Sequence, residues 1–220
     1  MLPDFAQQWN GDLRPVWGVD IAEFTFHADK NQPPPNGSWW LVFLDDSDQA
    51  NALAYHDLTN DGLPISKVFV KTLQADGASV SVGATHELCE MAVDPWLNSA
   101  YQDPQGTFWA GEICDPVESD QYAYTVGKTL VTDFVTPNWF AHQHAQGPID
   151  LQGHSRAPFE VLSGGYAQKF VVHRGWVQVT GRRAMQSTHA MHAAEGTRRE
   201  RRARQMAEWR RSEVRFGRAR

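Results

Sequence analysis

The chain has 220 residues, 41% of them hydrophobic, which is enough for one domain with a substantial core. No apolar run approaches the roughly 20 residues of a membrane-spanning helix, so we expect no membrane span. The net charge of −6 hides an acidic part, residues 1–181, and a basic part, residues 182–220, which holds twelve of the 20 Lys and Arg. We therefore expect a globular domain over residues 1–181 and an Arg-rich tail over residues 182–220 that is disordered or helical.

The first fifteen residues, MLPDFAQQWNGDLRP, do not have the basic region and apolar core of a secretory signal. We therefore expect a cytoplasmic protein, and a phage-encoded protein would have the same features. The tail has no recognisable nucleic-acid-binding signature, so contact with nucleic acid is expected only through the Arg residues of the tail.

Short hydrophobic segments separated by turn-forming residues predict a mixed α+β domain. Residues 5–10 favour a short helix that ends in an Asn-Gly-Asp turn, and residues 16–27 are rich in the β-branched and aromatic side chains of strands. Residues 39–44 (WWLVFL) predict a buried strand, and residues 48–56 fit either a helix or a strand.

Further strands follow. Residues 65–73 (ISKVFVKTL) predict a strand with Lys67 and Lys71 on a wet face, as at the edge of a sheet. Two later segments predict hairpins, one turning at Gly127-Lys128 and one within residues 159–179.

Residues 83–95 (GATHELCEMAVDP) predict the helix on which function depends. At about 100° per residue its four polar members fall within one arc of about 100°, and the apolar residues cover the far side, as in a core helix whose polar stripe faces a cleft. The polar members are His86, Glu87, Glu90 and Asp94. Pro95 ends the helix.

The charges on this stripe indicate a functional site. Three carboxylates on one arc repel each other unless a cation neutralises them, and Lys71 is the only basic residue from Val70 to the end of the helix. This favours a metal or catalytic site over a solvated helix face.

The segment His86-Glu87-x-x-Glu90 resembles the H-E-x-x-H motif of the zincin metallopeptidases, with Glu in place of the second His. In that family the first and fifth positions bind zinc, and the Glu after the first His is the general base for the metal-bound water. The resemblance therefore implies that His86 and Glu90 bind zinc or another divalent metal, with Glu87 as the catalytic base. It covers about residues 10–140 and implies an edge strand that pairs with an extended peptide.

A third metal ligand is expected from the second acidic segment. Zincins of the glutamate type take this ligand from a Glu downstream of the helix, which here implies Glu112, 22 residues after Glu90. Asp115 would then orient a ligand residue or the helix without binding the metal itself. Asp94, on the helix, would have the same supporting role. The reverse assignment, with Asp115 as ligand and Glu112 as support, stays open.

The remaining candidate side chains have ordinary interpretations. Cys89 and Cys114 lie beside the two acidic segments, and a disulfide, two buried thiols or zinc ligation all stay open, although a reducing compartment favours free thiols. His142 and His144 have ligand-like spacing in loop-like surroundings, which favours a surface pair. His56 precedes Asp57 in an apparent turn and is also interpreted as an ordinary side chain.

The sequence thus predicts an α+β, zincin-like metallopeptidase domain over residues 1–181, with a small mixed sheet packed on the active-site helix. The leading hypothesis is a zinc-dependent hydrolase of peptides or proteins. The alternative is a catalytically inactive zincin-like protein with a binding or structural role, for example a phage component.

Overall fold

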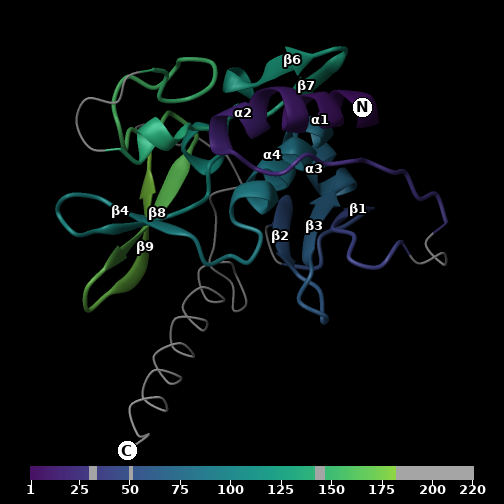
Figure 1. Cartoon of the computed structure of the whole chain (residues 1–220), viewed down its shortest axis with the longest axis horizontal. Coiled ribbons are helices and arrows are strands. Elements are labelled where there is room, and N and C mark those ends of the chain that lie inside the picture. Colours follow the sequence, from purple (N-terminus) through teal and green to yellow (C-terminus); the bar gives the residue numbers. More distant parts are fainter. Residues whose placement is uncertain (30–33, 50–51, 142–146, 182–220) are drawn as a thin grey trace, which may run out of the picture.

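Two small β-sheets, a β-hairpin and one long helix make up the computed structural model shown in Figure 1. The structure describes residues 1–29, 34–49, 52–141 and 147–181, and for these the mixed α+β class is confirmed. The predicted tail over residues 182–220 and the pair His142 and His144 lie outside the described residues. The described part of the chain contains no helix that is both long and apolar enough to cross a membrane.

The chain opens with helical turns that follow each other without a break. These are α1 (Leu2–Gln7), the π-helical η1 (Gln8–Leu13) and α2 (Arg14–Trp17), after which no helix or strand forms through residue 29. Phe5, Trp9 and Leu13 recur every four residues and are all buried, so one apolar face holds the segment in helical form. The turn predicted at residues 10–12 and the strand predicted at residues 16–27 are therefore wrong.

The first sheet has the strand order β1-β3-β2. Its strands are β1 (Trp40–Leu44), β2 (Ala54–Leu58) and β3 (Pro64–Phe69), with β1 parallel and β2 antiparallel to β3. The strand predicted at residues 39–44 is confirmed, but Trp40 and Phe43 are 38% and 43% exposed, so it is not a buried strand.

The strand predicted at residues 65–73 is half right. β3 ends at Phe69, and the chain continues into helix α3 (Val70–Asp76), so Lys67 lies on a strand and Lys71 on a helix. β3 is also the middle strand of its sheet, because β1 and β2 pair with its two sides. The two edge positions belong to β1 and β2.

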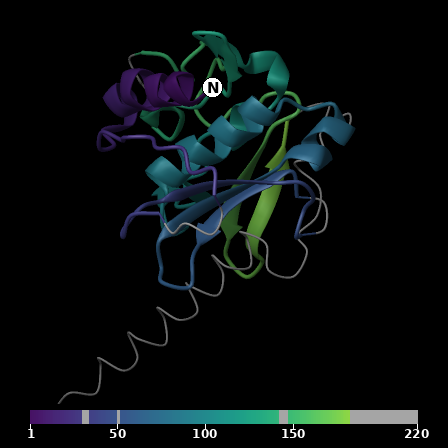
Figure 2. The same ribbon diagram turned by 90° about the vertical axis from the view of Figure 1, so that its right-hand side faces the viewer.

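Helix α4 (Val80–Val93) packs on β2 and β3, as Figure 2 shows. The Ser79 hydroxyl caps it by accepting the Val82 N–H at 3.4 Å, and the helix stops just before Asp94 and Pro95, close to the predicted end. It begins at Val80, three residues before the segment 83–95 that predicted the helix. Residues 82–91 are all buried, so the polar stripe lies in the interior rather than on an open face.

The second sheet is antiparallel, with the order β4-β5-β8-β9. Its strands are β4 (Ala100–Gln102), β5 (Phe108–Ala110), β8 (Tyr166–Val171) and β9 (Gly175–Thr180). The hairpin of β6 (Tyr124–Val126) and β7 (Thr129–Val131) contacts α4 through β7. Both predicted hairpins are confirmed. Short 3-10 helices lie at η2 (Asp115–Val117), η3 (Asp120–Tyr122) and η4 (Pro137–Trp139).

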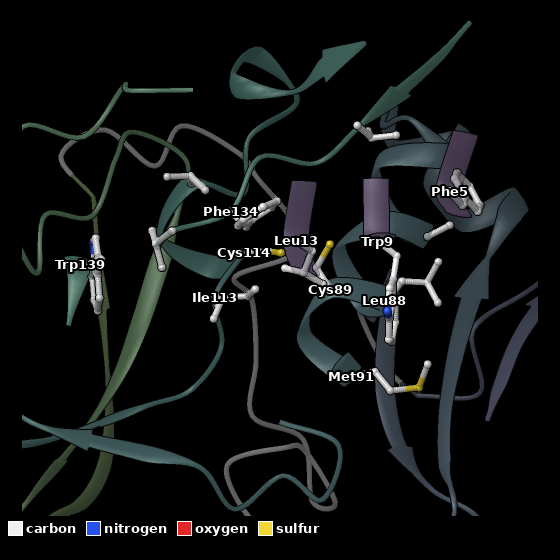
Figure 3. Close-up of a cluster of buried hydrophobic side chains, with 14 of the residues drawn as sticks. Phe5, Trp9, Leu13, Leu88, Cys89, Met91, Ile113, Cys114, Phe134 and Trp139 are labelled. Atoms are coloured by element: carbon white, nitrogen blue, oxygen red, sulfur yellow. The ribbon is translucent and has the colours of Figure 1, made fainter. Parts of the chain in front are cut away.

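The hydrophobic core joins α4 to the segment that follows β5. Figure 3 shows Leu13, Cys89, Ile113 and Cys114 side by side, and all four are nearly inaccessible to solvent. Both cysteines are free. Burial, together with the neighbouring Cys89, raises the pKa of the Cys114 thiol well above its ordinary value, which disfavours a zinc-bound thiolate there.

Candidate metal centre

Six buried side chains from three separate segments converge next to α4, and we call them the buried centre. β2 contributes one histidine, α4 contributes three polar side chains, and the segment after β5 contributes two carboxylates. They are His56, His86, Glu87, Glu90, Glu112 and Asp115. The most exposed of them, His86, is only 5% accessible to solvent.

Glu90 lies between the two histidines. Its Oε1 is 3.3 Å from His86 Nε2 and also accepts the Cys114 N–H at 3.3 Å, while its Oε2 is 3.7 Å from His56 Nδ1. The i, i+4 spacing on α4 places Glu90 beside His86, as the sequence predicts. The contact with His56 comes from the neighbouring sheet.

Asp115 and Glu112 contact different histidines. Asp115 Oδ1 lies 3.3 Å from His86 Nε2, whereas Glu112 Oε2 lies 3.9 Å from His56 Nε2. Ligand atoms that surround a zinc ion tetrahedrally at about 2.0–2.1 Å are about 3.3–3.4 Å from one another. His86 has this spacing to both Glu90 and Asp115. His86, Glu87 and Glu90 form a group whose ligand atoms all lie within 4.8 Å of one another, and of the two open assignments Asp115 is the one that contacts His86.

His56 is the member of the centre that the sequence interpretation missed. It lies in β2 rather than in a turn, is fully buried, and has its Nδ1 3.3 Å from Glu87 Oε2. The register pairs it with Ser66, whose hydroxyl donates to the Glu87 carbonyl at 3.3 Å, so both residues face α4. Residues 54–58 do not alternate between apolar and polar side chains, so the only signal of a strand was the turn at residues 60–62 that follows them.

His56 also has a ring nitrogen without a hydrogen-bond partner. Within the described part of the chain, no group makes a hydrogen bond with Nε2. The nearest acceptor given for it, Glu112 Oε2 at 3.9 Å, is too far away for a hydrogen bond. A buried imidazole nitrogen of this kind is normally paired or bound to a ligand.

A backbone turn sets the position of Glu112. Asp94 Oδ1 accepts the N–H groups of Asn98 and Ser99 at 2.7 and 2.8 Å, which folds the chain back after α4. The Gly111 N–H then donates to the Ser99 carbonyl at 3.0 Å, and a Cβ on Gly111 would lie 2.9 Å from the Ser99 Cβ. Asp94 thus supports the centre through this turn, and only glycine permits the close approach.

The electrostatics of the centre favour a positive charge. Burial alone would lower the pKa of His86, but Glu90, Asp115 and Glu87 raise it well above its ordinary value. The chain has no Lys or Arg between residues 72 and 127, which include most of the centre. Buried carboxylates gathered around two histidines need protons or cations to offset their negative charge.

A second group of similar residues lies between β7 and β8, and we call Asp133, Asp150 and His154 the loop cluster. His154 Nδ1 is 3.2 Å from Asp133 Oδ2 and 3.7 Å from Asp150 Oδ1, close enough for one cation. Burial and the adjacent Asp150 raise the pKa of Asp133 to about 8. Backbone N–H groups, however, already bind both carboxylates: Phe134 and Gln152 donate to Asp133, and His154 and Ser155 to Asp150.

Comparisons with protein-family models, with curated proteins and with solved structures gave no significant match. The buried centre is therefore the basis on which we infer a function.

Proposed function

We propose that the chain is a zincin-like, metal-dependent hydrolase that binds zinc or a related divalent ion through His86, Glu90 and Asp115. The observation that carries the proposal is the position of His86 Nε2, which is 3.3 Å from a carboxylate oxygen of Glu90 and of Asp115. Imidazole and carboxylate donors at this spacing suit zinc, and also iron or manganese.

Glu87 is the proposed general base. It follows His86 on α4, and its Oε2 lies 3.3 Å from His56 Nδ1, so an N–H on this nitrogen would orient the carboxylate. A bound zinc ion lowers the pKa of its water toward about 7, within reach of a carboxylate base. With zinc held by these residues, Glu87 would accept the proton that the activated water loses.

A peptide or protein is the proposed substrate. β2, which carries His56, has a neighbouring strand on one side only within its sheet. An exposed strand edge can pair with an extended peptide through main-chain hydrogen bonds. The sequence predicted this role for residues 65–73, and we propose β2 for it because β2 carries His56.

A structural metal site is the second candidate. Glu87 and His86 are only 2% and 5% exposed, and closed metal sites are typical of structural ions, whereas catalytic sites keep an open position. On this alternative the protein is a zincin-like binding or structural component that binds metal without turnover.

Metal analysis of the full chain, purified without added metal, tests the proposal. We expect bound zinc in the wild type and its loss in the double variant Glu90→Gln, Asp115→Asn. The matched control is Asp133→Asn, Asp150→Asn, which changes two equally buried carboxylates of the loop cluster and should retain the metal. Metal-free wild-type protein that cannot be loaded would refute the proposal. Metal without hydrolysis of peptide libraries would favour the structural role.

A further inference from the structure

We infer that the buried centre has a second cation site, formed by His56, Glu112 and the remaining oxygen of Glu90, so that Glu90 bridges two divalent ions. The inference rests on the proposed function, because both ions share Glu90. It differs from a zincin-like site, in which one ion suffices.

Geometry provides the first argument. One ligand atom from each of His56, Glu90 and Glu112 lies within 4.8 Å of the other two. Atoms that bind one ion at about 2.0–2.4 Å are separated by at most about 4–4.8 Å. Glu90 Oε1 lies 3.3 Å from His86 Nε2 and Oε2 lies 3.7 Å from His56 Nδ1, so the two oxygens of one carboxylate face the two histidines. Two ions bridged in this way are about 3.5–4 Å apart.

His56 provides the second, independent argument. Its Nε2 is fully buried, has no hydrogen bond with any described group, and lies 3.9 Å from Glu112 Oε2. Its Nδ1 lies 3.3 Å from Glu87 Oε2. Metal-binding histidines usually donate the second ring N–H to a carboxylate, which leaves the first nitrogen free for the ion. Glu87 is therefore the carboxylate that would fix this tautomer.

Charge provides the third argument. The centre combines four carboxylates with two imidazoles. With the carboxylates ionised and the imidazoles neutral, its charge is about −4, and one divalent ion leaves a net charge of about −2. Two divalent ions bring the net charge to zero. Because uncompensated buried charge is costly, the second ion would stabilise the arrangement. The mixture of oxygen and nitrogen donors suits zinc or manganese in both positions.

Metal titration separates this inference from the proposed function. The full chain is stripped with a chelator, dialysed against Zn²⁺ and analysed for bound zinc. We expect two equivalents in the wild type and one in each of His56→Gln and Glu112→Gln. The control His154→Gln, in the loop cluster, should keep two. Circular dichroism of each variant establishes that it is folded, and the two variants provide independent tests should one fail to fold.

Mn²⁺ provides a spectroscopic test on the same proteins. Two Mn²⁺ ions bridged by one carboxylate are magnetically coupled, so the wild type should lose the six-line spectrum of an isolated ion and His56→Gln should recover it. A wild type that binds one equivalent, lost on Glu90→Gln, would overturn the second site and leave the proposed function intact. No bound metal would overturn both. A second equivalent lost in Asp133→Asn would assign it to the loop cluster and overturn the inference.

Discussion

The buried centre and the loop cluster both combine histidine with carboxylates but are built differently. In the loop cluster all the residues lie between 133 and 155, and four backbone N–H groups bind the two Asp carboxylates. In the buried centre the residues come from β2, α4 and the segment after β5, and the contacts of the two histidines run to carboxylates. Carboxylates occur in both regions, so their presence does not identify a site. The groups that the carboxylates contact distinguish a structural turn from a candidate metal site.

The two regions also handle like charges differently. In the loop cluster Asp133 keeps a proton, because burial and Asp150 raise its pKa to about 8, whereas the N–H groups of Ser155 and His154 lower the pKa of Asp150 against the effect of burial. The buried centre has more carboxylates, and they raise the pKa of His86. A bound cation would neutralise their negative charge.

The largest effect is expected for Glu87→Gln. Loss of a general base lowers turnover by about 10²–10⁴-fold, while the metal content should stay unchanged because the proposed ligands remain. Peptide hydrolysis and metal analysis on the same preparation measure both. His154→Gln is the control, because the loop cluster has no proposed part in catalysis. If Glu87→Gln loses metal together with activity, Glu87 is a ligand.

Metal removal should destabilise the protein through the buried centre. A ligand present at about 1,000 times its dissociation constant contributes about 4 kcal/mol, which for a domain of this size is about 8–16 °C in melting temperature. Melting curves with and without a chelator measure the difference. We expect Asp133→Asn to show the same shift as the wild type, and Glu90→Gln to show none. An equal shift in Glu90→Gln would place the metal elsewhere.

The loop cluster should make the protein less stable as the pH rises. A salt-bridged carboxylate has the opposite effect, because its stabilisation is lost as the pH falls. The pKa of Asp133 is about 8 in the folded state against an ordinary value of 3.8, so the folded state retains a proton that the unfolded state releases. Stability from this group is present below pH 4 and falls as the pH rises toward 8.

The expected loss is several kcal/mol, since each unit of pKa shift corresponds to about 1.4 kcal/mol. The lowered pKa of Asp150 affects stability only at more acidic pH, so it does not offset this loss. Urea unfolding at several pH values measures the slope. Asp133→Asn should flatten it, because the amide does not titrate. An unchanged slope in this variant would show that Asp133 does not carry the shared proton.

The smallest effect is expected for Gly111→Ala. The new Cβ would lie 2.9 Å from the Ser99 Cβ, so the turn must shift, at a cost of about 1–3 kcal/mol. Because Glu112 follows directly, the second equivalent of metal should also bind more weakly. Gly11→Ala is the matched control, since a Cβ there meets no atom within 4 Å and the residue lies in a helical turn. Equal stability of both variants would contradict the tight contact.

The sequence alone determined the features that depend on neighbours along the chain. The end of α4, the placement of His86, Glu87 and Glu90 on one side of it, and the two hairpins follow from helical spacing and turn residues. These patterns need only a few residues, so they are readable without knowledge of the fold. The same local reasoning failed at residues 10–12, where burial of one helical face outweighed a turn signal.

Only the tertiary structure decided the membership of the buried centre. His56 enters it because β2 pairs antiparallel with β3 in the register that sets His56 opposite Ser66. Asp115 reaches His86 and Glu112 reaches His56 because the Asp94 turn and the contact between Gly111 and Ser99 fix the path after α4. The physical reason is that strand register and backbone approach are set by packing between distant segments, which no local pattern encodes.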